Sequence, residues 1–362
     1  MTTPSSGRRR FLTGMLATGL IPKATWADAG APRYVSAAAR PDGGFVLCGI
    51  DHHLEIVFRL PLPARGHAAA AHPNRPEVVA FARRPGTFAI VLDCVSGMQI
   101  ARLSAPNGRH FYGHGVFSQD GSKLFTTEND FGVGQGVVGV WDVARGYERV
   151  GEFASGGVGP HDIKRLPSSD VLVIANGGID THPESGRTKL NIPTMRPNLA
   201  YVEDEQVIET AELTREFHKK SIRHLAISST NDVAMGMQSE GDPDETALVG
   251  LHRRGQPIQL MQSPDAQLRA MQGYIGSIAF SGDDLLIAAT SPRGNLVHIY
   301  DAADRELIDA QRLQDVCGVS SKGRGFLLTA GTGEICHIRD SQGYQNVHNL
   351  MWDNHLVPIP NT

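Results

Sequence analysis

The stretch from Gly113 to Phe153 reads GHGVFSQDGSKLFTTENDFGVGQGVVGVWDVARGYERVGEF, and this stretch decides the fold. It holds a short apolar strand, an Asp120-Gly121 turn, a second apolar strand, a loop, a third strand ending in Trp141-Asp142, and a last strand. An Asp-Gly pair between alternating apolar residues is a strong hairpin signal. Four short antiparallel strands in about 45 residues are typical of one β-propeller blade.

The same order of turns and strands recurs along the chain, which indicates a repeat protein. Turn residues return at 40–44 and 281–284, and apolar third strands end again at Asp93 and Asp301. We therefore predict an all-β fold, a single β-propeller with seven blades of four antiparallel strands, although six or eight blades stay open. The last unit lacks a strand, which either terminus could supply. The units begin near Val35, His67, His110, Gly159, Ile222, Gly273 and Asp315.

Composition excludes several classes of protein. The 362 residues are 41% hydrophobic and 20% charged, which is typical of a packed globule and not of a disordered chain. The 40 glycines and 21 prolines follow no collagen period, so they indicate turns. Four cysteines are too few for a disulfide scaffold. The net charge of −4 argues against a nucleic-acid partner. We expect a monomer.

The first residues have the pattern of an export signal. Arg8, Arg9 and Arg10 precede Phe-Leu, a short apolar run and an Ala27-Asp28-Ala29 site. We assign residues 1–29 to a twin-arginine-type signal peptide and residues 30–362 to the propeller. The protein is then expected in the periplasm, and no later apolar run is long enough for stable membrane insertion. The pairing of the four cysteines, which would meet an oxidising compartment, stays open: Cys48, Cys94, Cys317 and Cys336.

Three histidines fall at matching positions of the repeat. When the units are aligned by their second strands, His114 lies opposite His161, and His224 falls at the same place or one residue away. The first strand of each blade lines the central channel, so three imidazoles would meet there. Imidazoles on separate rigid strands suit iron, copper or zinc. The sequence therefore predicts a transition-metal site in the channel, at which His114, His161 and His224 are the ligands.

Polar residues at blade ends could support this site. Glu128 and Gln238 end second strands, and we expect them at the mouth of the channel near the histidines, as further ligands or as groups that orient the rings. The polar loop from Asn176 to Pro197 should lie at the same mouth and could bind an anionic ligand. The remaining candidates for orienting or ligand-binding roles are Asn129, Asp162, Asn176, Asp180, His182, Arg187, Arg223, Arg293, Tyr274 and His72.

Two cofactor classes are excluded by their motifs. The glycine-rich segment 132–136 lacks the strand-turn-helix context of a dinucleotide site, so we expect no nucleotide. The sequence contains no C-x-x-C-H motif, so we expect no covalent haem.

The chain resembles an uncharacterised bacterial family of periplasmic, twin-arginine-exported propeller proteins, which is catalogued as a domain of unknown function. The resemblance covers essentially the whole chain after the signal. The motifs that carry it are His110-Phe-Tyr-Gly-His114-Gly, Thr127-Glu128-Asn129-Asp130, Gly159-Pro-His161-Asp162, Asn176-Gly-Gly-Ile-Asp-Thr-His182-Pro, Ser221-Ile-Arg-His224-Leu-Ala and Gln272-Gly-Tyr-Ile-Gly276-Ser. Genes of the family often lie beside those of imelysin-like and di-haem oxidoreductase-like proteins. The resemblance implies such metal-handling partners and places iron or copper ahead of zinc.

Three functions follow, and the sequence leaves the choice open. The first is a metal-binding protein acting in metal uptake or an associated redox step. The second is a metal-assisted hydrolase of the lactonase kind, in which Glu128 or Asp162 acts as the base. The third is a non-catalytic interaction scaffold whose channel histidines only form hydrogen bonds. Whether the protein is an enzyme therefore stays undecided at this point.

Overall fold

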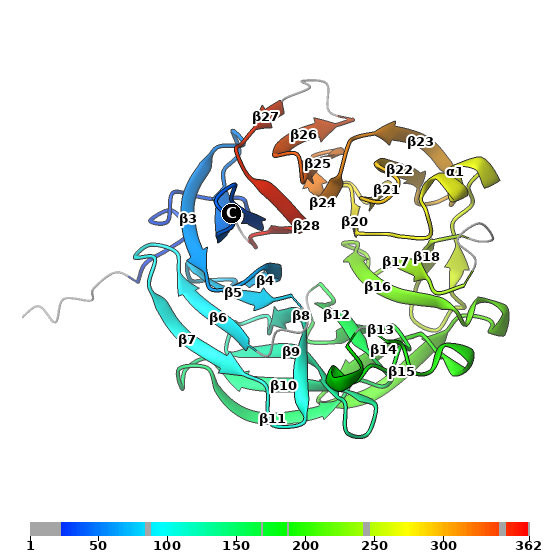
Figure 1. Ribbon diagram of the computed structural model, residues 1–362, viewed down its shortest axis with the longest axis horizontal. Helices are drawn as coiled ribbons and strands as arrows, with labels where there is room; N and C mark the ends of the chain where they lie inside the picture. The colour runs from blue at the N-terminus through cyan, green and yellow to red at the C-terminus, as the bar shows by residue number, and fades with distance from the viewer. Residues whose placement is uncertain are drawn as a thin grey trace, which may run out of the picture.

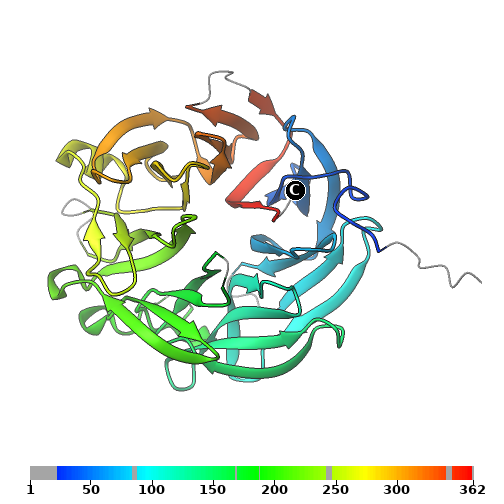
Figure 2. The same ribbon diagram turned by 180° about the vertical axis from the view of Figure 1, so that it is seen from behind.

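The computed structural model describes residues 23–83, 88–167, 169–186, 188–241, 247–339 and 345–360. Seven four-stranded antiparallel sheets form a ring around a central channel, as Figures 1 and 2 show from opposite faces. The predicted seven-bladed β-propeller is confirmed. The segment 1–22, which contains the twin arginines, lies outside the described residues. Within the described part of the chain, no helix is long and apolar enough to cross a membrane.

Each blade contributes one inner strand to the channel wall and three strands that lead outward. Blade 1 consists of β28 Met351–Pro358, β1 Tyr34–Ala39, β2 Phe45–Ile50 and β3 Ile56–Leu62. Blade 2 consists of β4 Gly66–Ala71, β5 Glu77–Ala82, β6 Phe88–Asp93 and β7 Gln99–Ser104. Blade 3 consists of β8 Arg109–Phe117, β9 Lys123–Asp130, β10 Gln135–Asp142 and β11 Glu148–Ala154. Blade 4 consists of β12 Pro160–Arg165, β13 Leu172–Asn176, β14 Asn198–Glu203 and β15 Gln206–Glu212.

The remaining three blades follow the same order. Blade 5 consists of β16 Lys220–Ile227, β17 Val233–Ser239, β18 Val249–His252 and β19 Gln259–Leu260. Blade 6 consists of β20 Ser277–Phe280, β21 Leu286–Ser291, β22 Leu296–Asp301 and β23 Leu307–Arg312. Blade 7 consists of β24 Val316–Lys322, β25 Gly325–Ala330, β26 Glu334–Ile338 and β27 Gln345–Val347. The described helices are short: η1 Pro183–Ser185, η2 Ile192–Thr194, η3 Arg215–Phe217 and α1 Asp265–Ala270.

The ring closes by pairing the end of the chain with its beginning. β28 pairs antiparallel with β1, with Val35 opposite Val357, and the Ser36 hydroxyl donates to the His355 carbonyl at 2.8 Å. The expectation that the last unit lacks a strand was wrong, because blade 7 has all four strands of its own. Blade 1 is the incomplete unit, and the C-terminal strand supplies its inner position. This closure leaves the inner edge of β1 paired.

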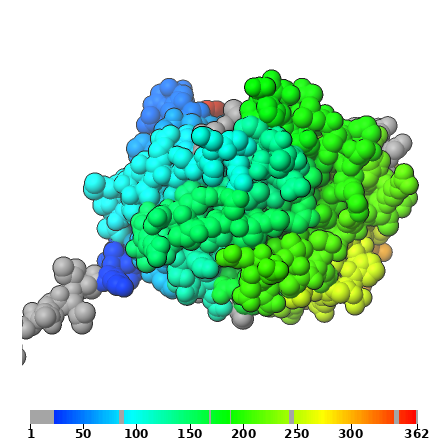
Figure 3. Space-filling view, turned by 90° about the horizontal axis from the view of Figure 1, so that it is seen from below, coloured from blue at the N-terminus to red at the C-terminus, as the bar shows by residue number. Residues whose placement is uncertain are grey.

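The hydrophobic core lies between neighbouring blades. All five residues of β13 are buried, because its two faces pack against two different blades. In one such interface Phe81 of blade 2 packs with Phe111, Leu124 and Trp141 of blade 3. Outer strands such as β11 are mostly exposed to solvent, with Phe153 buried, and Figure 3 shows the cyan and green segments forming the outer wall. The buried blade faces fix the position of the inner strands.

The segment before β1 is part of this core. Trp26 is buried between blades 1 and 2, and its indole N–H donates to the His72 carbonyl at 3.1 Å. Ala29 packs in the same cluster. The propeller body therefore begins upstream of residue 30, inside the range 1–29 that the sequence pattern assigned to the signal. The four cysteines are all free thiols in the structure.

Candidate metal centre

Five histidines from five consecutive blades meet in the channel. They come from the inner strands of blades 1 to 5, which are neighbours around the ring. Four of the rings are buried, and the His161 ring is partly buried. Their centroids lie 4.7 to 5.0 Å apart for most neighbouring pairs, for example 5.0 Å between His161 and His224. The five residues are His355, His67, His114, His161 and His224.

Irregular pairing of the inner strands aims these rings into the channel. The register between β8 and β9 shifts from Phe111 to Gly115, and His114 lies within that shift. Similar shifts lie at His67 on β4, at His161 on β12 and beside His224 on β16. A bulge bends the strand and redirects a side chain that regular pleating would turn into the blade. The glycines on both sides of His114 permit this bend, and Gly113 has a φ of 97°.

The three predicted ligands form one compact group. One ring nitrogen of each of His114, His161 and His224 lies within 4.8 Å of the other two. A second group of the same kind consists of His67, His114 and His355, so His114 belongs to both. The Nε2 atoms of His67 and His114 are 3.2 Å apart. The structure therefore brings the predicted trio together and adds two imidazoles to it.

Hydrogen bonds from the far side of two rings fix their orientation. Nδ1 of His114 lies 3.0 Å from Oδ1 of Asp162, and a carboxylate accepts the proton of that nitrogen. Nδ1 of His161 donates to the Arg223 carbonyl at 2.9 Å. Nε2 of His161 is thus left as a lone-pair donor for the channel, while Nε2 of His114 is an acceptor that faces Nε2 of His67 at 3.2 Å. A metal-binding histidine commonly has such a carboxylate or carbonyl behind it.

Several ring nitrogens in the cluster lack a partner among the described residues. Both nitrogens of His224 are buried without a hydrogen bond, as are Nδ1 of His67 and Nε2 of His355. Buried polar atoms in proteins are nearly always paired, and leaving one unpaired costs about 1–3 kcal/mol. The cluster therefore has hydrogen-bonding capacity that no described residue satisfies, and a bound cation would use the ring nitrogens that carry a lone pair.

The electrostatics keep the imidazoles in the form that binds metal. Burial, reinforced by the neighbouring rings and arginines, holds the pKa values of His67, His161 and His355 well below their ordinary value. Burial likewise lowers the pKa of His224 to about 3. Burial opposes the ionisation of Asp162, but Lys164 and His114 outweigh it and lower the pKa of that carboxyl. At neutral pH His67, His161, His224 and His355 are therefore neutral imidazoles, and metal ions bind the neutral ring.

A cavity of about 780 Å³ reaches the cluster from one end of the channel. It touches Asp162, His224 and His355, and its mouth is formed by the turns that join first and second strands, such as Ser118-Gln119. The mouth at which the sequence predicts Glu128 and Gln238 is the opposite one, where the second strands end. The sequence does not predict this cavity, because the positions of the turns do not show which end of the channel is filled by side chains.

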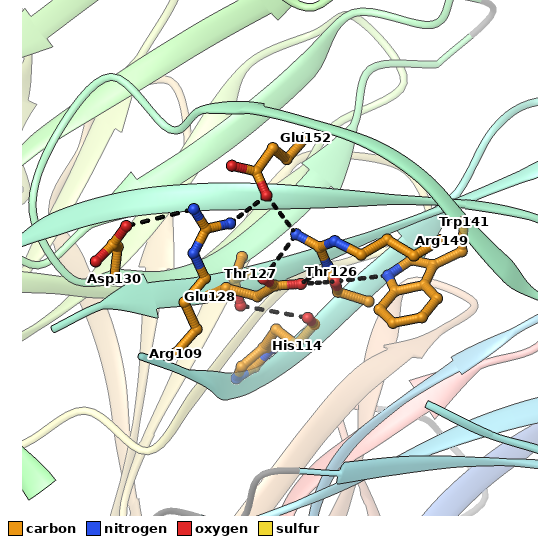
Figure 4. Close-up of polar contacts among 9 residues, drawn as sticks. All are labelled: Arg109, His114, Thr126, Thr127, Glu128, Asp130, Trp141, Arg149 and Glu152. Atoms are coloured by element: carbon orange, nitrogen blue, oxygen red, sulfur yellow. Dashed lines mark hydrogen bonds and ion pairs between the residues drawn. The ribbon is translucent and has the colours of Figure 1, made fainter. Parts of the chain in front are cut away.

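Glu128 does not approach the histidines, which corrects its predicted role. Its carboxylate is fully buried, accepts a hydrogen bond from Arg149 at 2.6 Å and another from the Thr126 hydroxyl at 3.0 Å. Strand alternation places the next residue, Thr127, on the opposite face of the blade, where its hydroxyl donates to the His114 carbonyl at 3.2 Å. Figure 4 shows the Glu128 carboxylate turned toward Arg149 and the His114 ring pointing away from it. Gln238 also lies elsewhere, because its amide donates to the Ile275 carbonyl.

The asparagines and the long loop form the opposite end of the channel. The Asn129 amide donates to the Thr181 carbonyl at 3.0 Å, and the Asn176 amide donates to the Ser155 carbonyl at 2.9 Å. These bonds anchor the loop after β13. The backbone N–H of Asp180 bonds to Asn191, and the His182 ring packs edge-on against Phe131 at 5.0 Å. None of these side chains is a member of the two histidine groups, and Arg187 lies outside the described residues.

The other candidates stabilise blade junctions. The Arg293 guanidinium lies 4.3 Å from the centre of the Tyr274 ring. The Arg223 guanidinium nitrogen Nη2 lies 3.9 Å from Oε1 of Glu240. Only the backbone carbonyl of Arg223 contributes to the centre, by accepting the hydrogen bond from His161. The His72 ring bonds to the Gly121 carbonyl at 3.1 Å and so ties blade 2 to blade 3. These contacts explain the polar residues at the junctions without a ligand.

Comparison with known proteins places the chain in a family. A family described as "Protein of unknown function (DUF1513)" matches residues 60–359. The chain belongs to this family. No curated protein matches the chain. Among solved structures, Kuenenia stuttgartiensis hydrazine synthase is similar, with a TM-score of 0.63 and 14% identity over 90% of this chain and 99% of that one. At this identity the likeness concerns the propeller fold alone.

Sequence reasoning missed two members of the centre in this DUF1513 chain. His67 was seen only as a residue near the matching position, and His355 was not considered. His355 was missed because the strand 351–358 was not recognised as the inner strand of blade 1. Had C-terminal closure been assumed, His355 would have fallen at the same repeat position as the other four rings.

Proposed function

We propose that this propeller binds a transition metal ion in its channel through His114, His161 and His224. The observation that carries the proposal is the meeting of three ring nitrogens within 4.8 Å, two of them on rings that Asp162 and the Arg223 carbonyl orient. Such preorganisation removes much of the ordering cost of binding. His67 and His355 stand beside the trio as further imidazole donors.

The donor set suits iron, copper or zinc, and we place zinc after the other two on the family resemblance. Both groups within the described residues consist of histidine alone, and the four thiols are not part of them. Imidazole suits all three metals, whereas the soft thiolates that select Cu(I) are missing from these groups. Genes of the family that the chain resembles often lie beside genes of metal-handling proteins, and this association supports iron or copper over zinc.

The cavity supports a role in metal uptake or in an associated redox step. A structural metal is closed off by four protein ligands, whereas an exchanging or reactive metal keeps a position open. Here the cavity touches His224 and His355, so one side of the cluster faces a space that small molecules can fill. A metal in this position can receive and release a further ligand.

The cellular setting belongs to the same proposal. The twin-arginine pattern around Arg8, Arg9 and Arg10 supports a periplasmic location. Imelysin-like and di-haem oxidoreductase-like proteins would be its partners in moving or oxidising the metal. Export in a folded state would allow the ion to enter the channel before or after transport.

Elemental mass spectrometry of the purified protein tests the metal site. We expect close to one equivalent of iron or copper in the native protein and less than a tenth of that in a His114→Ala/His161→Ala variant. A His298→Gln variant is the matched control, because His298 is a buried histidine on β22, outside the channel groups. Background metal in the native protein after reconstitution, or equal metal in all three proteins, would overturn the proposal.

A further inference from the structure

We propose that the cavity is the binding site for a small carboxylate, held jointly by the channel metal and by the Lys164 ammonium. This inference rests on the proposed metal site and adds to it the class of the exchangeable ligand. Three observations support it: Lys164 lies beside the cluster, the Asp162 carboxylate already accepts hydrogen bonds from other groups, and the cavity has a partly polar lining.

Lys164 lies where a ligand of the metal would pass. It follows Asp162 by two residues on β12, so the two side chains leave the strand on the same face. Its ammonium nitrogen is 3.8 Å from Oδ1 of Asp162, and both residues line the cavity together with His224 and His355. The Lys164 side chain is 38% exposed, so its ammonium is open to the cavity while it stands beside the cluster.

Asp162, the carboxylate beside Lys164, is already engaged. Asp162 accepts the Nδ1 proton of His114 at 3.0 Å and the backbone N–H groups of Ile163 and Leu225 at 2.8 and 3.0 Å. A divalent metal and the Lys164 ammonium together carry three positive charges, whereas Asp162 beside them carries one negative charge. In a confined space that excess attracts an anion far more strongly than it would in water.

The cavity fits a small organic anion in size and lining. About 780 Å³ lies within the range of small-molecule sites. Ser277 and Ser320 line its wall beside apolar groups such as Ile278 and Val319, which suits a ligand with a polar head and a short carbon body. A carboxylate has two oxygens, so it can serve a metal and an ammonium at the same time.

The neighbouring Arg165 offers a matched control. It lines the same cavity, but its guanidinium donates to the carbonyls of Leu166 and Ser169 at 3.2 and 2.7 Å. Arg165 therefore has the same formal charge as Lys164, but its guanidinium is held by backbone carbonyls and does not stand beside Asp162. A variant at Arg165 therefore shows how much the loss of any positive charge at the cavity weakens carboxylate binding, apart from the loss of the direct contact with Lys164.

The experiment uses the full-length protein loaded with Cu(II), after its metal content is measured. Azide serves as the reporter, because an azide bound to Cu(II) gives a charge-transfer band, and acetate is then titrated to displace it. We expect acetate to compete and neutral acetamide not to compete. Lys164→Met should weaken acetate binding roughly tenfold, as loss of a charge-assisted contact would. Lys164→Arg and Arg165→Gln should stay within about twofold of the native protein.

Each result bears on the inference in a defined way. Circular dichroism and unchanged copper content show that the variants fold and keep the metal. If copper binds but acetate affinity is the same in Lys164→Met, or if acetamide competes as well as acetate, the inference fails and the metal site stands. If Arg165→Gln weakens acetate as much as Lys164→Met does, the specific role of Lys164 is wrong. If copper does not bind in the channel, both the metal site and this inference fall.

Discussion

At the scale of single residues, the centre depends on groups that orient the histidine rings from behind. Asp162 holds His114 by its far nitrogen, and the Arg223 carbonyl does the same for His161. These contacts decide which ring nitrogen faces the metal. Glu128, the acidic residue that looked most like a ligand in the sequence, holds Arg149 inside blade 3 instead. Two predictions separate these roles.

The first prediction concerns Asp162. Replacing it in Asp162→Asn removes the charge behind His114 but keeps a side chain of the same size. We expect metal affinity to fall by about 10- to 100-fold, the usual cost of losing an outer partner of a histidine ligand. Titration with Cu(II) measures the change, and Asp232→Asn, in a surface ion pair with Arg253, is the control. An unchanged affinity in Asp162→Asn would show that His114 does not need this orientation.

The second prediction concerns Glu128. Glu128→Ala removes the fully buried partner of Arg149, whose side chain is 18% exposed, and leaves Glu152 as the remaining carboxylate beside it. We expect the free energy of unfolding to drop by about 3 kcal/mol, because the partly buried guanidinium loses the carboxylate that offsets its desolvation. Metal content should stay at the native level. Denaturant titration and elemental analysis check the two halves, and a loss of metal without a loss of stability would restore Glu128 as a ligand.

At the scale of elements, the two ends of the chain complete the body. β28 closes the ring and brings His355 into the channel, while the segment around Trp26 seals the gap between blades 1 and 2. The bulges in the inner strands are the second device at this scale, since they aim the rings. Neither the closure by the chain ends nor the bulges of the inner strands is part of the regular repeat of the blades.

A prediction follows for the N-terminal segment. Trp26→Ala removes a buried indole and its hydrogen bond to the His72 carbonyl. We expect a loss of about 3–5 kcal/mol in the free energy of unfolding, as for other buried aromatic truncations. Chemical denaturation measures it, and Val95→Ala, at a side chain 45% exposed, is the surface control. A loss below about 1 kcal/mol would mean that this segment is not part of the folded body.

The repeat explains how much of this could be predicted. Asp-Gly turns and alternating strands are local, so the seven blades and the meeting of His114, His161 and His224 followed from spacing. The direction of Glu128, the engagement of Asp162 and the contribution of His355 depend on contacts between residues that are distant in sequence or on bulges. A pattern with a period of two residues cannot show where one extra residue turns a side chain.

At the scale of the whole molecule, acid should destabilise the protein. Burial lowers the pKa of His298 to about 4, while the unfolded chain has the ordinary value of 6.5. Below pH 6.5 the unfolded state therefore binds the proton first, and stability is lost as the pH falls toward 4. For this residue alone the loss amounts to about 3 kcal/mol. Unfolding measured from pH 7 to 4 checks it, and a His298→Gln variant should lose less. An equal loss in both proteins would contradict the assignment.

The central claim is that the ring of blades exists in part to hold a metal in its channel. Crystals of the metal-loaded protein, measured on both sides of the absorption edge of that metal, test it most directly. We predict one anomalous peak at about 2.0–2.1 Å from ring nitrogens of His114, His161 and His224. Channel histidines without such a peak, in crystals whose metal content is stoichiometric, would contradict the account and place the metal elsewhere.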